Sequence, residues 1–267
     1  IHHSTLKFRQ TYNLTPNLQA KGGEKADSKP RSYLPNSNLS PNFTTMRVII
    51  TAATVAEWMP CFLNINHLYT SESQRLKLQF HQSGIGMLAA SHALTKLALE
   101  DKPDLIIQAG IAGCYDSTME LGTVVAIKDE TIGDLGVEED GKWKDLFDMK
   151  LEKSSYHPFD KRKLPNQWLA KYNLLALPEY AGLTINEIST HQERIDLLVK
   201  KYNPIIESME GAALHYTARE LNIPFLQIRS ISNYVGERNK ANWQMKTAID
   251  NLNNTLIAYI EKLYQIV

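Results

Sequence analysis

From Met46 onward, short apolar runs alternate with segments of helical periodicity. Such runs are typical of buried strands, and they cover 46–53, 76–81, 104–108, 122–128, 182–188, 204–207 and 224–228. Helical segments cover 87–100, 191–202, 209–221 and about 242 to the end. Strands that alternate with helices predict a mostly parallel sheet covered by helices on both faces. We therefore expect an α/β fold, a three-layer αβα arrangement with a twisted mixed, mostly parallel central sheet.

Two segments depart from this alternation. Residues 1–45 are rich in Ser, Asn, Pro, Lys and Thr and have few large apolar side chains, so they cannot bury enough surface to offset their ordering entropy. We expect them to form a disordered or non-native N-terminal extension, followed by one domain over 46–267. Residues 133–180 are polar with scattered aromatics, and we interpret them as a long insertion or lid.

Composition narrows the class of protein. The formal net charge is zero and there is no long basic run, so we expect no nucleic-acid partner. The two cysteines, Cys61 and Cys114, cannot form a disulfide framework and fit a reducing, cytoplasmic compartment. No apolar run approaches the roughly 18 residues that span a membrane. The histidines are dispersed, and we expect neither a metal site nor a cofactor.

Polar or glycine-rich groups follow most of the predicted strands. They are Glu57, the run Gly84-Ile-Gly86, the run Ala109-Gly-Ile-Ala-Gly113, Glu210 and Asn233. In α/β sheets ligands bind beyond the carboxyl ends of the strands. The sequence therefore predicts that these groups converge on one site.

The two candidate acids, Glu57 and Glu210, each have two interpretations. Glu57 can act as a general base that polarises a water molecule, or it can close a capping box with Thr54, and one carboxylate can do both. Glu210 opens a helix, where its carboxylate can bind the cis-diol of a ribose or simply cap the helix. Met209 can lie against a sugar face or belong to the core.

The remaining groups are also ambiguous when taken singly. Gly84-Ile-Gly86 can be an anion-binding nest or a plain turn. The run from Ala109 to Gly113, with Gly110 and Ile111, can let backbone approach a ligand or only turn tightly. Asn233 can read the edge of a heteroaromatic base or form a turn. Cys114 has no activating neighbour in the sequence, and we interpret it as a structural thiol.

Taken together and in this order, these segments resemble the nucleoside phosphorylase and nucleosidase superfamily, over essentially all of Met46–Val267. Within that superfamily, Ser208-Met-Glu-Gly-Ala-Ala213 and Ser232-Asn-Tyr-Val-Gly-Glu-Arg238, with Trp243 following, resemble the futalosine hydrolases of menaquinone biosynthesis. The resemblance implies a homodimer or higher homo-oligomer that acts on a small nucleoside.

The resemblance also implies roles for single residues. Glu57 matches the acid that activates water in methylthioadenosine/adenosylhomocysteine nucleosidases, and Met209 with Glu210 matches their ribose-binding pair. Asn233 stands where those adenine-specific enzymes carry an aspartate. Hypoxanthine offers two acceptors, N7 and O6, at the edge where adenine offers an acceptor and a donor. An amide NH2 can donate to either acceptor, so Asn233 predicts a 6-oxopurine leaving group.

The resemblance favours hydrolysis over phosphorolysis. Gly110 and Ile111 belong to the loop that binds substrate in the superfamily, and Ile111 stands where a serine would serve phosphate. An acid such as Glu57 would repel phosphate as well. We expect futalosine hydrolysis, with release of hypoxanthine. An adenosine-type nucleosidase and a catalytically silent nucleoside-binding protein are the alternatives.

Overall fold

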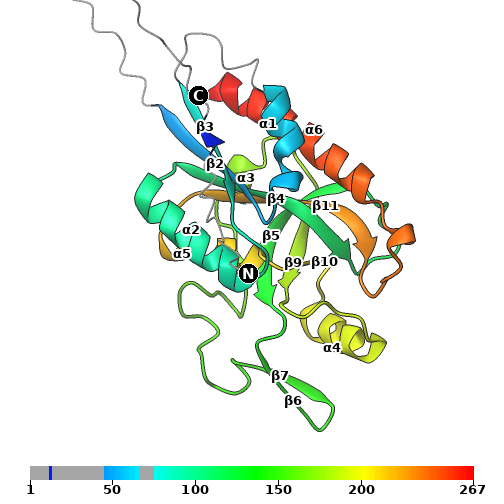
Figure 1. Cartoon of the computed structure of the whole chain (residues 1–267). Coiled ribbons are helices and arrows are strands. Elements are labelled where there is room, and N and C mark those ends of the chain that lie inside the picture. Colours follow the sequence, from blue (N-terminus) through cyan, green and yellow to red (C-terminus); the bar gives the residue numbers. More distant parts are fainter. Residues whose placement is uncertain (1–11, 14–44, 66–74) are drawn as a thin grey trace, which may run out of the picture.

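The computed structural model describes residues 12–13, 45–65 and 75–267. The described strands form a mixed sheet in the order β1–β3–β2–β4–β10–β9–β5–β11, with β8 beside β5. Because β11 also pairs with β4, the strands β4, β10, β9, β5 and β11 form a closed barrel. The strands β2 and β3 extend the sheet beyond β4 (Figure 1). The bounds are β1 Tyr12–Asn13, β2 Met46–Ala52, β3 Leu76–Gln82, β4 Leu105–Cys114, β5 Val124–Ile132, β8 Leu164–Pro165, β9 Glu179–Thr184, β10 Ile206–Ser208 and β11 Phe225–Tyr234.

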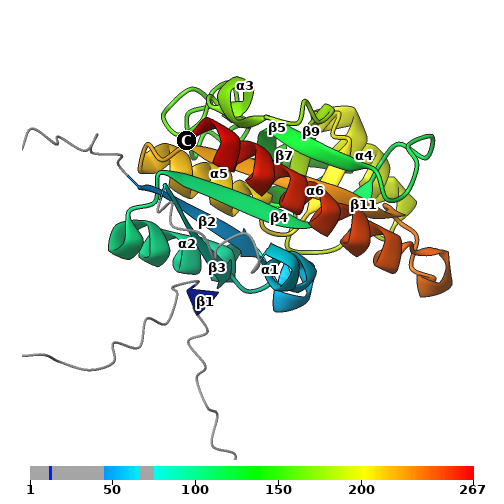
Figure 2. The same cartoon turned by 90° about the horizontal axis from the view of Figure 1, so that it is seen from above.

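The predicted fold class is confirmed. β2 runs parallel to β3 and β4, β4 to β11, and β9 to β5 and β10, while β4–β10 and β5–β11 are antiparallel. Helices α1 (Met59–Ile65) and α6 (Met245–Ile266) cover one face, and α2 (Met87–Asp101) and α5 (Gly211–Glu220) cover the other (Figure 2).

The apolar residues of the strands divide between these two layers. Ile107 faces α6 and packs with Leu256, whereas its neighbour Ile106 packs with Leu94 of α2 and Leu214 of α5. Each such fully buried side chain contributes about 1.5–3 kcal/mol relative to an exposed one. In α2, Leu94, Leu97 and Ala98 are buried, whereas Leu88 is 86% exposed.

Two strands run further than the sequence pattern suggested. The glycine-rich run from Ala109 to Gly113 continues β4, and Asn233 lies inside β11 and not at the tip of a turn. The reason is tertiary, since β4 and β11 pair along their whole length, from Phe225 against Ile106 to Tyr234 against Cys114. This ladder holds glycine residues extended that would otherwise favour a turn.

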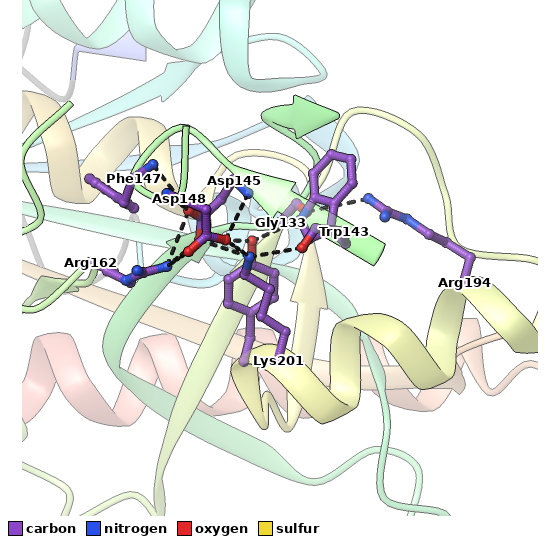
Figure 3. Close-up of polar contacts among 9 residues, drawn as sticks. Gly133, Trp143, Asp145, Phe147, Asp148, Arg162, Arg194 and Lys201 are labelled. Atoms are coloured by element: carbon purple, nitrogen blue, oxygen red, sulfur yellow. Dashed lines mark hydrogen bonds and ion pairs between the residues drawn. The ribbon is translucent and has the colours of Figure 1, made fainter. Parts of the chain in front are cut away.

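Residues 133–180, which we interpret as a long insertion or lid, contain short regular elements. They contain the hairpin of β6 (Gly136–Glu139) and β7 (Lys142–Asp145), the strand β8, and helix α3 (Leu169–Tyr172). Asp145 and Asp148 lie between Arg162 and Lys201, the latter from α4 (Gln192–Tyr202) (Figure 3). The Arg194 guanidinium of α4 lies 3.9 Å from the Trp143 ring centroid. The segment is thus fastened to α4, and its role as a lid stays a prediction.

The predicted extension at 1–45 lies almost wholly outside the described residues and stays a prediction. Of it, Tyr12–Asn13 pairs antiparallel with Gln79–Phe80 of β3. In the described ranges, no helix has the length and apolar character to cross a membrane. The same ranges contain no group of three or more His, Cys, Asp and Glu side chains arranged to hold a metal ion.

Candidate active site

The predicted site residues lie within, or just after, strands that are neighbours in the sheet. Glu57 closes the 3-10 turn η1 (Val55–Glu57) directly after β2, and Gly110 and Ile111 lie in β4. Glu210 is the N-cap of α5, just after β10, and Asn233 lies near the end of β11. The structure brings Glu57, Gly110, Ile111 and Glu210 together around one arginine.

Glu57 is buried and held from two sides. Its Oε2 accepts hydrogen bonds from the Thr54 backbone N–H at 2.9 Å and from the Thr54 hydroxyl at 3.0 Å, which confirms the capping box. Its Oε1 accepts from the Ile111 backbone N–H at 3.2 Å. Burial raises the pKa of Glu57, while the Thr54 and Ile111 hydrogen bonds and the Arg229 charge act in the opposite direction. A carboxyl whose pKa is raised by burial inside a cluster of charged groups is a candidate proton acceptor.

The arginine at the centre is Arg229, which the sequence reading did not select. It is 1% exposed, and its Nη2 donates to Gln108 Oε1 at 2.9 Å and lies 3.8 Å from Glu210 Oε2. A Cβ at Gly110 would lie 2.2 Å from Arg229 Nη1 and 3.0 Å from Glu57 Oε1, so those two atoms are no more than about 5 Å apart. One buried cation therefore serves both acids. The sequence signal was an arginine directly after the predicted strand 224–228.

Glu210 is held at the start of α5 by the first glycine-rich segment. Its Oε1 accepts from the Gly86 N–H at 3.0 Å. Gly86 has a φ of 86°, a conformation that favours glycine and that turns its N–H toward the acid. This segment thus binds the protein's own carboxylate through one backbone N–H. Met209 is half-buried beside it, between β10 and α5.

Gly110 lies against two side chains of the site, and its role toward a ligand stays a prediction. Its missing side chain makes room for the Arg229 and Glu57 side chains, both from this chain. Ile111 contributes its backbone N–H to Glu57, as described above. Its role toward substrate stays a prediction.

Asn233 has a fixed amide orientation. Its Nδ2 donates to the Tyr234 carbonyl at 3.0 Å, and its Oδ1 accepts from the Ser232 hydroxyl at 2.8 Å. A carbonyl oxygen can only accept, so the atom facing it must be the NH2 group. Among the described residues, this NH2 group makes no other hydrogen bond. Cys114 is buried, and burial raises the pKa of its thiol, as expected of a structural cysteine.

Part of the chain matches a known protein family, and several known proteins are similar to the chain. The family model described as the phosphorylase superfamily matches residues 180–262, which include Met209, Glu210, Arg229 and Asn233. The futalosine hydrolase of Thermus thermophilus is 29% identical over 174 residues, 64% of this chain and 76% of that protein. A 5'-methylthioadenosine/S-adenosylhomocysteine nucleosidase of Pseudoalteromonas translucida is 26% identical over 211 residues, 73% of this chain and 84% of that protein.

A solved structure has the same fold. The methylthioadenosine/adenosylhomocysteine nucleosidase of Colwellia psychrerythraea, in complex with adenine, superposes with a TM-score of 0.66 at 20% identity, covering 83% of this chain and 97% of that one. The chain therefore has the fold of this nucleosidase, its residues 180–262 match the phosphorylase superfamily, and futalosine hydrolases and methylthioadenosine/adenosylhomocysteine nucleosidases are among its distant relatives.

Proposed function

We propose that this protein hydrolyses the N-glycosidic bond of futalosine, releasing hypoxanthine and dehypoxanthine futalosine, in menaquinone biosynthesis. The observation that carries the proposal is the amide of Asn233. One N–H of its NH2 group donates to the Tyr234 carbonyl, and we propose that the other N–H donates to the base. That donor suits N7 or O6 of a 6-oxopurine. The similarity to proteins named futalosine hydrolase supports the same substrate.

The proposed reaction assigns one task to each side chain. The bond between the ribose C1′ and the purine nitrogen lengthens to an oxocarbenium-like cation, whose hydroxyls Glu210 binds and whose face packs on Met209. Asn233 donates a hydrogen bond to the departing base, which takes its proton from water. Glu57 accepts a proton from the attacking water molecule while the water oxygen forms the bond to C1′. General-base catalysis of this kind contributes roughly 10²–10⁴-fold.

Water is favoured over phosphate as the nucleophile by the charges present. The carboxylate of Glu57 would repel a phosphate anion at the position of attack. The nearby cation Arg229 is already engaged by Gln108 and Glu210. Ile111 adds no hydroxyl that a phosphate could use.

A second candidate is an adenosine-type nucleosidase that acts on methylthioadenosine, adenosylhomocysteine or aminofutalosine. It is favoured by relatives with that name, such as the one 26% identical to this chain. The amide at position 233 argues against it. A catalytically silent nucleoside-binding protein is disfavoured because Glu57 and Glu210 are both in place and share Arg229.

One assay separates these functions. The protein is incubated with futalosine, methylthioadenosine and inosine, with and without phosphate, and the released base is identified by chromatography. Hypoxanthine from futalosine without phosphate supports the proposal. Adenine release would support the second candidate, and no release the silent binder. Asn233→Asp should lower hypoxanthine release, and unchanged release with no gain on the amino analogue would contradict the reading of the base.

We also propose that the protein acts in the cytoplasm as a homodimer or higher homo-oligomer. Ile85 and Leu88 flank Gly86, the residue that holds Glu210, and they are 64% and 86% exposed. Apolar side chains so exposed beside the site suit a contact with a second copy. Sedimentation of wild type and of Leu88→Glu tests this, since the variant should dissociate. A monomeric wild type would contradict it.

A further inference from the structure

A buried acid that has no task in the proposed reaction lies under the start of α5. Glu130 of β5 is 1% exposed. A Cβ at Gly211, the first residue of α5, would lie 1.9 Å from Glu130 Oε1, so the carboxylate packs directly against the backbone of that residue. Glu210, which we assign to the ribose, is the residue just before Gly211. Glu130 thus contacts the backbone next to the site.

A second glycine makes room for the same carboxylate. Glu130 pairs with Gly182 of β9, where a Cβ would lie 2.5 Å from Glu130 Oε1 and 3.0 Å from Oε2. Gln227 Nε2 donates to Oε1 at 2.9 Å. A larger residue at 182 or 211 would collide with the acid. The two glycines therefore form a cradle that is matched to the side chain of Glu130.

The hydroxyl of Thr184 connects this acid to α5. It donates to Glu130 Oε2 at 2.9 Å and accepts from the Ala212 backbone N–H at 2.7 Å. The Ala212 N–H belongs to the first turn of α5, where amides have no acceptor within the helix. A hydroxyl has a single proton, so it accepts best from Ala212 when that proton is directed at another acceptor. Glu130 Oε2 is that acceptor, and it fixes the orientation of the hydroxyl.

The start of α5 depends on this connection because Glu210 does not cap the helix with its own side chain. The Glu210 carboxylate instead accepts from the Gly86 N–H at 3.0 Å and lies 3.8 Å from Arg229 Nη2. Its main-chain carbonyl is 3.4 Å from Gln108 Nε2, a long hydrogen bond. Thr184 makes the shorter contact to the first turn and so determines where Glu210 enters the site.

We propose that Glu130 is a positioning residue, which acts through the Thr184 hydroxyl and the start of α5 to place the Glu210 carboxylate against the ribose. The proposal rests on the proposed function, in which Glu210 binds the ribose hydroxyls. Glu130 itself does not touch the substrate. A displacement of about 1 Å in such a positioned group can lower the rate by about 10²-fold.

A purely structural role is the alternative, in which Glu130 and Thr184 only hold β5, β9 and α5 together. The two roles differ in which ligands they affect. A loosened fold weakens every ligand of the site, including a free base. A displaced Glu210 affects only ligands that carry a ribose, so the affinity for free hypoxanthine stays as in wild type.

The test compares kcat/KM for futalosine with the calorimetric dissociation constant of free hypoxanthine. Thr184→Val keeps the shape of the side chain and removes the hydroxyl, so kcat/KM should fall about 10-fold or more. The dissociation constant of hypoxanthine should stay within about threefold of wild type. Glu210→Ala is the reference for a lost ribose contact and should give the same pattern. Thr184→Ser retains the hydroxyl and should restore most of kcat/KM. A wild-type kcat/KM in Thr184→Val, or an equal loss in both measurements, overturns the proposal.

Thr131→Val is the matched control. Thr131 is a buried threonine of β5 next to Glu130, but it pairs with Leu183, whose side chain packs with Leu198 of α4. Both measurements should stay within about threefold of wild type in this variant. A loss of kcat/KM as large as that in Thr184→Val would show that any buried threonine of this sheet has the same effect, and would overturn the proposal.

Substitutions of Glu130 test the origin of the effect. Glu130→Gln keeps an oxygen for the Thr184 hydroxyl, whereas Glu130→Leu removes it. Glu130→Leu should show the pattern of Thr184→Val, and equal kcat/KM in the two Glu130 variants overturns the proposal. If Thr184→Val does not fold, Thr184→Cys replaces it, because a thiol is only a weak donor and acceptor. Its kcat/KM should then fall by about threefold or more with hypoxanthine binding unchanged, and wild-type kcat/KM overturns the proposal.

Failure of the proposed function would appear elsewhere, in the nucleoside that wild type cleaves. The same comparison is then made with that nucleoside, or with the binding of inosine if wild type cleaves none. Failure of this inference appears only in the effect of the substitutions on the ribose-bearing ligand relative to the free base.

Discussion

Replacing Arg229 by methionine should shift the pH dependence of the reaction. Arg229 Nη1 and Glu57 Oε1 are no more than about 5 Å apart, because a Cβ at Gly110 would lie 2.2 Å and 3.0 Å from them. At an effective dielectric constant of about 20, two unit charges at about 5 Å interact by about 3 kcal/mol, which corresponds to about 2 pH units. Since Arg229 also interacts with Glu210, we expect its removal to move the ionisation of Glu57 by only about 1–2 pH units.

The sign follows from the chemistry. The positive charge of Arg229 favours the ionised form of Glu57, so its removal raises the pKa of Glu57 further. A general base works only when ionised, so activity is lost below its pKa. The acidic limb of the kcat/KM profile should therefore move to higher pH in Arg229→Met.

The assay is kcat/KM for futalosine from pH 4 to 9, with urea denaturation to show that each variant is folded. Arg229→Lys is the matched control, because it keeps the charge and should leave the acidic limb within about half a unit of wild type. A folded Arg229→Met variant whose acidic limb coincides with that of wild type would refute the electrostatic coupling of Arg229 to Glu57.

Three further predictions concern the same region. Glu57→Gln should lower kcat by roughly 10²–10⁴-fold with KM nearly unchanged, measured by steady-state kinetics. Gly110→Ala places a methyl group 2.2 Å from Arg229 Nη1, so kcat/KM should fall by about 10-fold or more and urea denaturation should show a loss of about 1–3 kcal/mol. Burial raises the pKa of Glu130 from 4.5 to about 7, so its contribution to stability is present below pH 4.5 and is lost as the pH rises through about 7. Glu130→Gln should remove this loss, on the order of 3 kcal/mol, in urea denaturation at pH 5 and pH 8.

These predictions have clear contrary outcomes. Near-normal turnover in Glu57→Gln would remove that residue from the mechanism, and Glu187→Gln, at an exposed acid, serves as its control. A Gly110→Ala enzyme with the wild-type rate would show that the Arg229 side chain can move aside. Equal loss of stability between pH 5 and pH 8 in Glu130→Gln and in wild type would place the titrating group elsewhere.

Burial favours a neutral carboxyl at Glu130, whereas the hydrogen bonds from Gln227 and Thr184 and the Arg229 charge favour the ionised form. Glu130 is 1% exposed, and its oxygens contact Gln227 Nε2 and the Thr184 hydroxyl, each at 2.9 Å. In the described part of the chain, Gln227 Oε1 and His215 Nε2 are buried without hydrogen-bond partners. A protonated Glu130 could donate to a reversed Gln227 amide, which would then donate to His215. Every member of the network would then have a partner.

The sequence by itself determined the α/β class, the positions of most elements and the candidate acids Glu57 and Glu210. These features are local, because strand and helix periodicity and a capping box are written in neighbouring residues. The tertiary structure alone decided that β4 and β11 pair along their whole length. Because of this pairing, a glycine-rich run that was expected to form a loop is part of a strand. It also decided that Arg229 joins two acids and that Glu130 lies under the start of α5. Both depend on pairing between strands far apart in the chain, for which the sequence carries no periodic signal.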